Sequence, residues 1–142
     1  IPMIYSSTVD APLSYIWKIR FNETSKAPAF TNVFPELNHN EMTGFDGLGE
    51  SAELAKKFYF IFLKDSADDA RIIKRMEVME KIFIRKGLRV KVLELIGDTL
   101  PRKVFNSVAL ADWTSYFLAL EYGADPDSVP MVEEFKKLVS SE

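Results

Sequence analysis

Phe58-Tyr59-Phe60-Ile61-Phe62-Leu63 is a continuous apolar run, and it decides the fold predicted for this chain. It begins after Lys56-Lys57 and ends at Lys64-Asp65-Ser66, so charged residues close it on both sides. A strand that is apolar at every position can be buried on both faces, as in parallel sheets that helices cover on each side. The run therefore predicts a central strand of an α/β protein.

The segments on either side of the run alternate between strand and helix patterns. Residues 1–5 are short and apolar, and residues 9–23 carry apolar side chains at helical spacing. Residues 68–85 repeat the helical pattern, and residues 88–95 alternate apolar and charged side chains, as a strand at or near a sheet edge does. This order predicts a parallel sheet with helices on both faces.

Two more helices are expected after the last strand, at residues 100–122 and 131–139. The first of them has two apolar stripes, and such a helix usually lies between two layers or at an interface. One stripe comprises Val104, Val108, Ala111, Ser115 and Leu118, and the second comprises Leu110, Trp113, Phe117 and Leu120.

Length and composition indicate one ordinary globular domain of 142 residues, with 47% hydrophobic and 27% charged residues. The net charge of -3 gives no reason to expect nucleic acid as a partner. No apolar run approaches the roughly 18 residues of a membrane span, so no membrane partner is expected. Cysteine is absent, which removes thiolate chemistry and fits a reducing cytoplasm, the expected location. The opening Ile1-Pro2-Met3-Ile4-Tyr5 looks like the middle of a strand, so we expect an excised domain of a longer protein.

A polar stretch at residues 22–41 interrupts the apolar pattern and contains the only histidine of the chain. Pro28 and Pro35 exclude a single long helix there, so a loop with one or two short helical turns is expected. The glycines of residues 44–49 continue the loop, and they follow no clear strand that would make them a phosphate-binding loop.

His39 is the first candidate for a chemical role in this stretch. A lone histidine is more often a surface or hydrogen-bonded core residue than a catalyst. Its neighbours Asn38, Asn40 and Glu41 favour a role, because a catalytic histidine needs a partner to fix its tautomer and tune its pKa. A metal site is not expected, since carboxylates without a second histidine form only weak oxygen-ligand sites.

Glu23 is the second candidate. The ordinary interpretation is a solvated glutamate near a helix end. The functional interpretation is a general base that moves a proton between adjacent carbons, with Lys26 or Asn22 holding nearby groups. Lys136 and Lys137, on the last helix, are by default a solvated pair.

The spacing of these residues resembles a known family. Asn22-Glu23-x-Ser25-Lys26, Pro28-Ala29 and Pro35-Glu36-x-x-His39-Asn40-Glu41 resemble the C-terminal half of the bifunctional phosphoglucose/phosphomannose isomerases. Ala111-Asp112-Trp113-x-Ser115 and Gly123-x-Asp125-Pro126 are similar to later segments of the same family, so the resemblance covers almost the whole chain.

The resemblance implies a sugar isomerase (SIS) domain over residues 1–142, the C-terminal half of a two-SIS-domain isomerase. Its fold would be α/β: a flavodoxin-like three-layer α/β/α sandwich with a mainly parallel, about five-stranded sheet. The implied reaction interconverts glucose 6-phosphate or mannose 6-phosphate with fructose 6-phosphate through a cis-enediolate. No cofactor and no metal are implied.

The family's functional residues carry over to particular positions. Glu23 stands where the family has the base, and His39 where it has the histidine that assists ring opening across a dimer. Lys136, with Lys137 as the alternative, is assigned to the family's C-terminal lysine, which acts on the ring oxygen. The expected substrate-binding residues are Asn22, Lys26 and Asn40. Thr24 departs from the asparagine expected there, at a position outside the proton-transfer groups.

The implied partners are a phosphosugar, an N-terminal SIS domain of the same protein and a second copy in a homodimer. Because the first domain would supply most phosphate-binding hydroxyls and an arginine, the isolated chain is expected to be inactive or nearly so. The two-striped helix at residues 100–122 would normally pack on that domain, so the isolated chain is also expected to self-associate through it. The alternatives are an SIS module that binds a phosphosugar without turning it over, and a purely structural dimerisation domain.

Overall fold

The apolar run forms strand β3 (Tyr59–Lys64), which lies inside the sheet of the computed structural model. The structure describes residues 1–140, and within them the sheet has four parallel strands in the order β2-β1-β3-β4. The other strands are β1 (Pro2–Ser7), β2 (Phe30–Phe34) and β4 (Arg89–Glu94). The helices are α1 (Ala11–Glu23), α2 (Glu41–Gly44), α3 (Glu50–Ala55), α4 (Ala70–Arg85), α5 (Leu100–Glu121) and α6 (Pro130–Val139), with a 3-10 turn η1 (Glu36–Asn38).

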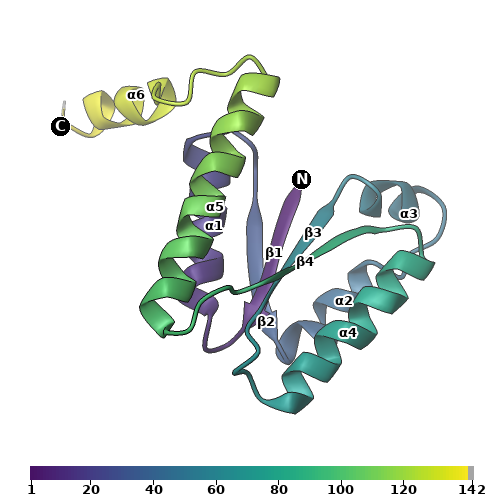
Figure 1. Ribbon diagram of the computed structural model, residues 1–142. Coiled ribbons are helices and arrows are strands. Elements are labelled where there is room, and N and C mark those ends of the chain that lie inside the picture. Colours follow the sequence, from purple (N-terminus) through teal and green to yellow (C-terminus); the bar gives the residue numbers. More distant parts are fainter. Residues whose placement is uncertain (141–142) are drawn as a thin grey trace.

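Helices cover both faces of the sheet, as the sequence predicts (Figure 1). Successive side chains of β3 point to opposite faces: Phe60 and Phe62 pack with one cluster under α4, and Ile61 and Leu63 pack with another under α1 and α5. This alternation of buried side chains explains why every position of the run is apolar. The predicted α/β fold is confirmed, with four described strands where the resemblance implies about five.

Strand β2 corrects the expectation of a loop with short helical turns across residues 22–41. Phe30–Phe34 pairs in parallel with β1 and forms one edge of the sheet. Its middle residues are only partly buried, and Phe34 alone is fully enclosed. An edge strand needs hydrogen bonds to one neighbour only, so the free edge of β1 orders a segment with little apolar pattern. The predicted short helical turns follow it, as η1 and α2. Helix α3 lies beyond the glycines of residues 44–49, at residues for which the sequence predicts no element.

Strand β4 forms the opposite edge, as its alternating pattern predicts. Helix α5 packs its inner stripe against α1, where Trp17 Nε1 donates a hydrogen bond of 2.9 Å to Ser107 Oγ. Its outer stripe is uncovered: Leu110, Trp113, Phe117 and Leu120 are 47 to 61% exposed. The predicted self-association through this helix stays a prediction.

Helix α6 projects away from the sheet and its layers (Figure 1). None of its side chains is buried, although five of them are apolar. Within residues 1–140, no helix is both long and apolar enough to cross a membrane.

Candidate active site at the end of helix α1

The end of α1 is a chain reversal held by the residues of the Asn-Glu motif. Asn22 Oδ1 accepts a hydrogen bond of 2.8 Å from the Ala29 backbone N–H, which ties the helix to the start of β2. The buried Ser25 hydroxyl donates to the Phe21 carbonyl at 2.6 Å and closes the last turn. These contacts explain why a short motif of fixed polar residues stands between α1 and β2.

Lys26 lies in the left-handed region of backbone space, with φ of 56°. For a residue with a Cβ this conformation costs about 1 kcal/mol or more, and such strain clusters at functional sites. The Lys26 ammonium donates to the Glu23 carbonyl and to the Pro126 carbonyl, the latter at 3.1 Å. Lys26 therefore joins the end of α1 to the loop that leads into α6.

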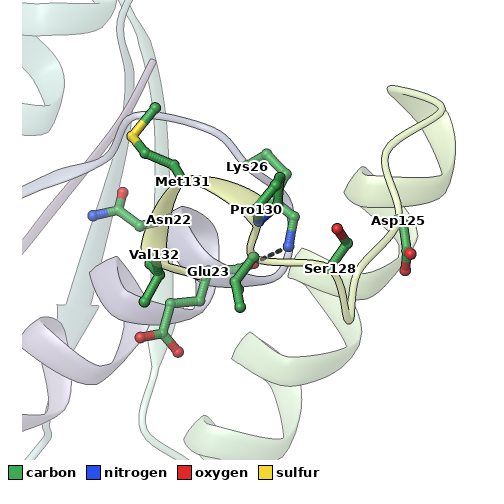
Figure 2. A pocket seen from close by; sticks show the side chains of 9 residues that line it. Asn22, Glu23, Lys26, Asp125, Ser128, Pro130, Met131 and Val132 are labelled. Atoms are coloured by element: carbon green, nitrogen blue, oxygen red, sulfur yellow. Dashed lines mark hydrogen bonds between the residues drawn. The ribbon is translucent and has the colours of Figure 1, made fainter. Parts of the chain in front are cut away.

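Glu23 is left with a free carboxylate by this arrangement. Its side chain is exposed and makes no hydrogen bond or ion pair within residues 1–140. It lies on the wall of a cavity of about 610 Å³, a volume within the range of small-molecule sites. Figure 2 shows Asn22, Glu23 and Lys26 of the reversal beside Pro130, Met131 and Val132 at the start of α6. The remaining lining residues come from the α5–α6 loop and the first turn of α6: Asp125, Ser128, Val129, Pro130, Met131 and Val132.

His39 and Asn40 lie at the opposite end of the strands. Glu23 precedes β2 and His39 follows it, so the five residues of the strand separate them by roughly 16 Å along its direction. The His39 ring is exposed and has no partner in the described part of the chain, and Asn40 Nδ2 donates to Glu36 Oε1 at 2.9 Å. The structure thus brings Asn22, Glu23 and Lys26 together and keeps His39 and Asn40 apart from them.

Lys136 lies about one helical turn beyond Val132, the last α6 residue on the cavity wall. Its ammonium pairs with Glu133 at 2.8 Å, and both side chains are exposed. Lys137 is exposed on the same helix. Neither lysine lines the cavity in this arrangement of α6.

A second polar group, which the sequence reasoning missed, lies at the carboxyl edge of the sheet between β1 and β3. The buried Asp65, directly after β3, forms an ion pair with Lys103 of α5. Asp10, after β1, is also buried. Burial, then the charges of Asp68 and Asp65, raises the pKa of Asp10. Carboxyl ends of parallel strands meet at one edge, so acidic residues directly after two strands were the available signal.

The acidic character of this edge disfavours a phosphate there, although parallel α/β sheets commonly bind ligands at such a crevice. Within residues 1–140, the cation in contact with the group is Lys103, and Asp65 already neutralises it. Among the same residues, histidine, aspartate and glutamate side chains form no group of three that could hold a metal ion.

Comparison with known proteins gives consistent matches. A family model described as the bacterial phospho-glucose isomerase C-terminal SIS domain matches residues 1–139. The chain is 35% identical over 137 residues to a bifunctional phosphoglucose/phosphomannose isomerase of Aquifex aeolicus, covering 96% of the chain and 42% of that protein. It is 36% identical over 140 residues to the Thermoplasma acidophilum protein of the same name, covering 99% of the chain and 42% of the relative. The chain therefore spans about two fifths of the length of these curated relatives.

Solved structures give the same fold. A glucose-6-phosphate isomerase like protein from Thermus thermophilus superposes with a TM-score of 0.69 at 20% identity, over 92% of this chain and 42% of that one. At this identity the match supports the fold alone.

Proposed function

The chain belongs to the bacterial phospho-glucose isomerase C-terminal SIS domain family, and from that premise we propose that it is the catalytic C-terminal domain of an aldose–ketose isomerase. The proposed reaction interconverts glucose 6-phosphate and mannose 6-phosphate with fructose 6-phosphate. The observation that carries the proposal is the unpaired Glu23 carboxylate on the wall of a cavity large enough for a sugar phosphate.

Glu23 is the proposed base. It takes the proton from C2 of the aldose, and the resulting cis-enediolate receives a proton at C1 to become the ketose. One carboxylate can serve both carbons because they are neighbours. Its lack of a partner within residues 1–140 supports this role, since an ion pair would compete for the same oxygens.

Asn22 and Lys26 are the proposed substrate-binding residues beside it. The Asn22 carbonyl oxygen is engaged by Ala29, so its Nδ2 amide is the group with capacity to donate to a sugar hydroxyl. The strained Lys26 places an ammonium at the same wall, where it can donate to an anionic intermediate.

His39 is proposed to assist ring opening in the site of a second copy, together with Lys136 of α6. Its separation from Glu23 by the length of β2 supports this, because both residues of one chain are too far apart for one hexose. A homodimer, with Asn40 contacting the substrate beside His39, is part of this proposal. The choice between Lys136 and Lys137 and the expected cytoplasmic location stay predictions.

The phosphate group is proposed to bind a preceding SIS domain of the same protein. Two observations support this partner: the relatives are longer than the chain, and the carboxyl edge of the present sheet is acidic. The 142-residue chain alone is accordingly expected to show little turnover.

Glu23→Gln in the two-domain protein tests the function. The expected result is a loss of turnover of roughly 10²- to 10⁴-fold, with loss of solvent-proton exchange at C2 and unchanged binding of fructose 6-phosphate. Glu50→Gln, an exposed glutamate at the start of α3, is the matched control. Unchanged turnover in Glu23→Gln would refute the base assignment, and binding without turnover by the unmodified protein would favour the phosphosugar-sensing alternative.

A further inference from the structure

Glu41 is the first residue of α2 and follows His39 by two positions. Its side chain turns back to the sheet and accepts two hydrogen bonds. Tyr5 Oη donates to Oε1 at 2.8 Å, and Asn32 Nδ2 donates to Oε2. One carboxylate therefore links the helix after His39 to β1 and to β2.

Both donors are fixed in place. The Tyr5 side chain is fully buried and packs against the rings of Phe34, Phe60 and Phe62. Burial, followed by the charge and hydrogen bond of Glu41, raises the pKa of Tyr5, so its hydroxyl stays a proton donor. Asn32 Oδ1 accepts from the Val33 N–H at 2.8 Å, which aims the amide nitrogen at Glu41.

The turn that carries His39 is thus anchored on both sides, while the histidine ring itself is unanchored. Leu37 is fully buried before it, and Glu41 is bound to the sheet after it. Thr43 Oγ1 donates to the His39 carbonyl at 3.4 Å, which adds one weak contact between the two anchors. The direction of the His39 side chain therefore depends on where Leu37 and Glu41 hold the backbone.

A carboxylate suits this position well. Two donors converge on Glu41, and its two oxygens accept one hydrogen bond each. A glutamine would offer one oxygen to both donors, and its amide group would need an acceptor of its own. No lysine or arginine of the described chain pairs with Glu41, so its charge is held by neutral donors alone. Replacing buried charged groups by packed apolar residues is often neutral or stabilising, which leaves room for a role of Glu41 beyond stability.

We propose that Glu41 is a positioning residue that aims His39 into the site of the neighbouring subunit for the ring-opening step. This inference rests on the proposed isomerase function and on the role of His39 in it. Glu41 acts through the position of the His39 backbone and does not itself touch the sugar.

A double-mutant cycle in the two-domain protein tests the inference, with His39→Ala, Glu41→Gln and the double variant. Two substrates are compared: fructose 6-phosphate, which must open its ring, and a four-carbon aldose 4-phosphate, which cannot close one. We expect Glu41→Gln to lower kcat/KM for fructose 6-phosphate roughly 10- to 100-fold and to leave the acyclic substrate within about twofold. In the His39→Ala background, Glu41→Gln should cause no further loss.

Tyr5→Phe is the second variant, because it removes one of the two hydrogen bonds and keeps both the buried ring and the charge. Tyr5→Phe should lower kcat/KM for fructose 6-phosphate by a smaller factor than Glu41→Gln, with no loss on the acyclic substrate and none in the His39→Ala background. Glu50→Gln should leave kcat/KM unchanged. If the losses in kcat/KM from Glu41→Gln and His39→Ala were additive, or if Glu41→Gln lowered kcat/KM equally for both substrates, the positioning role would be overturned. The isomerase function would still stand. An unaffected His39→Ala variant would instead remove the His39 role, and this inference with it.

Discussion

Asp10 is the residue whose charge fits the fold least well. It is 6% exposed at the start of α1, where burial, Asp68 and Asp65 all raise its pKa. The Ser7 hydroxyl and Lys103 act in the opposite direction and do not offset these effects. Because the pKa of Asp10 is higher in the folded protein than in the unfolded chain, folding disfavours the charged carboxylate, which therefore destabilises the fold at neutral pH.

Asp10→Asn is therefore expected to raise the free energy of unfolding at pH 7 by roughly 1 kcal/mol, as for relief of one unfavourably buried polar group. The gain should shrink as the pH falls through the raised pKa of Asp10. It should vanish below about pH 4, where Asp10 is protonated in both the folded and unfolded states. Urea unfolding of the 142-residue chain from pH 4 to 8 measures this, with the exposed Asp127→Asn as control. A destabilised Asp10→Asn at pH 7 would contradict it.

For single residues, the sequence identifies candidate side chains better than it identifies the distances between them. Glu23 and Lys26 are found from their motif, and the structure brings them to one cavity wall. The link between Tyr5 and Glu41 is not visible in the sequence, because 36 positions separate them and only the pairing of β1 with β2 brings them together.

Among the elements, α5 is joined to the end of β3 by the ion pair of Lys103 and Asp65. Both side chains are nearly enclosed, at 13 and 10% exposure. Burial acts to raise the pKa of Asp65, but the hydrogen bond and charge of Lys103, with the Ala67 amide, outweigh it and hold the pKa below the usual value.

Lys103→Met is expected to lower the free energy of unfolding by about 3 kcal/mol at pH 7, because it leaves the Asp65 charge buried and uncompensated. The favourable pairing is present above the unfolded pKa of about 3.9 and is lost as the pH falls through the lowered folded pKa. The difference between the variant and the parent should therefore narrow in acid. Asp65→Asn with Lys103→Met should recover much of the loss, and a double variant as unstable as Lys103→Met would show that the charge is not the cause.

Helices and strands whose apolar residues recur at a regular spacing were predictable from the sequence, but strand β2 was not. The helices α1, α4, α5 and α6 and the strands β1, β3 and β4 all lie where their apolar patterns predict them. Phe30–Phe34 has polar residues in its middle, and only the open edge of β1 makes it a strand. Because β2 was not predicted, the distance between Glu23 and His39 was not predictable either, since a loop could have brought the two residues together.

For the whole molecule, the main feature is an apolar surface that no other part of residues 1–140 covers. On the outer side of α5, Trp113 stacks on Phe117, and Tyr116 meets both rings edge to face. Helix α6 exposes five further apolar side chains. The two apolar stripes of α5 are visible in the sequence. Which of them meets this domain's own core depends on packing against α1 and was not predictable.

The proposal that His39 serves the site of the second copy leads to a prediction for the assembled dimer. Glu23→Gln and His39→Ala variants of the two-domain protein should each be nearly inactive, because each lacks one group in every site. A mixed dimer has one site with neither group and one site with both. Random mixing should therefore restore about a quarter of the unmodified activity.

Co-refolding the two variants in equal amounts and measuring fructose 6-phosphate turnover tests this arrangement. Each variant refolded alone is the background. Each variant refolded with an equal amount of Glu50→Gln should give half of the unmodified activity whether or not subunits exchange, and so controls for the refolding yield. If Glu23 and His39 served the same site of one chain, the mixed dimer would contain no complete site and activity would stay at the background. Recovery depends on β2 keeping Glu23 and His39 at opposite ends of the strand. The experiment therefore links a strand that is hard to recognise in the sequence to the proposed homodimer.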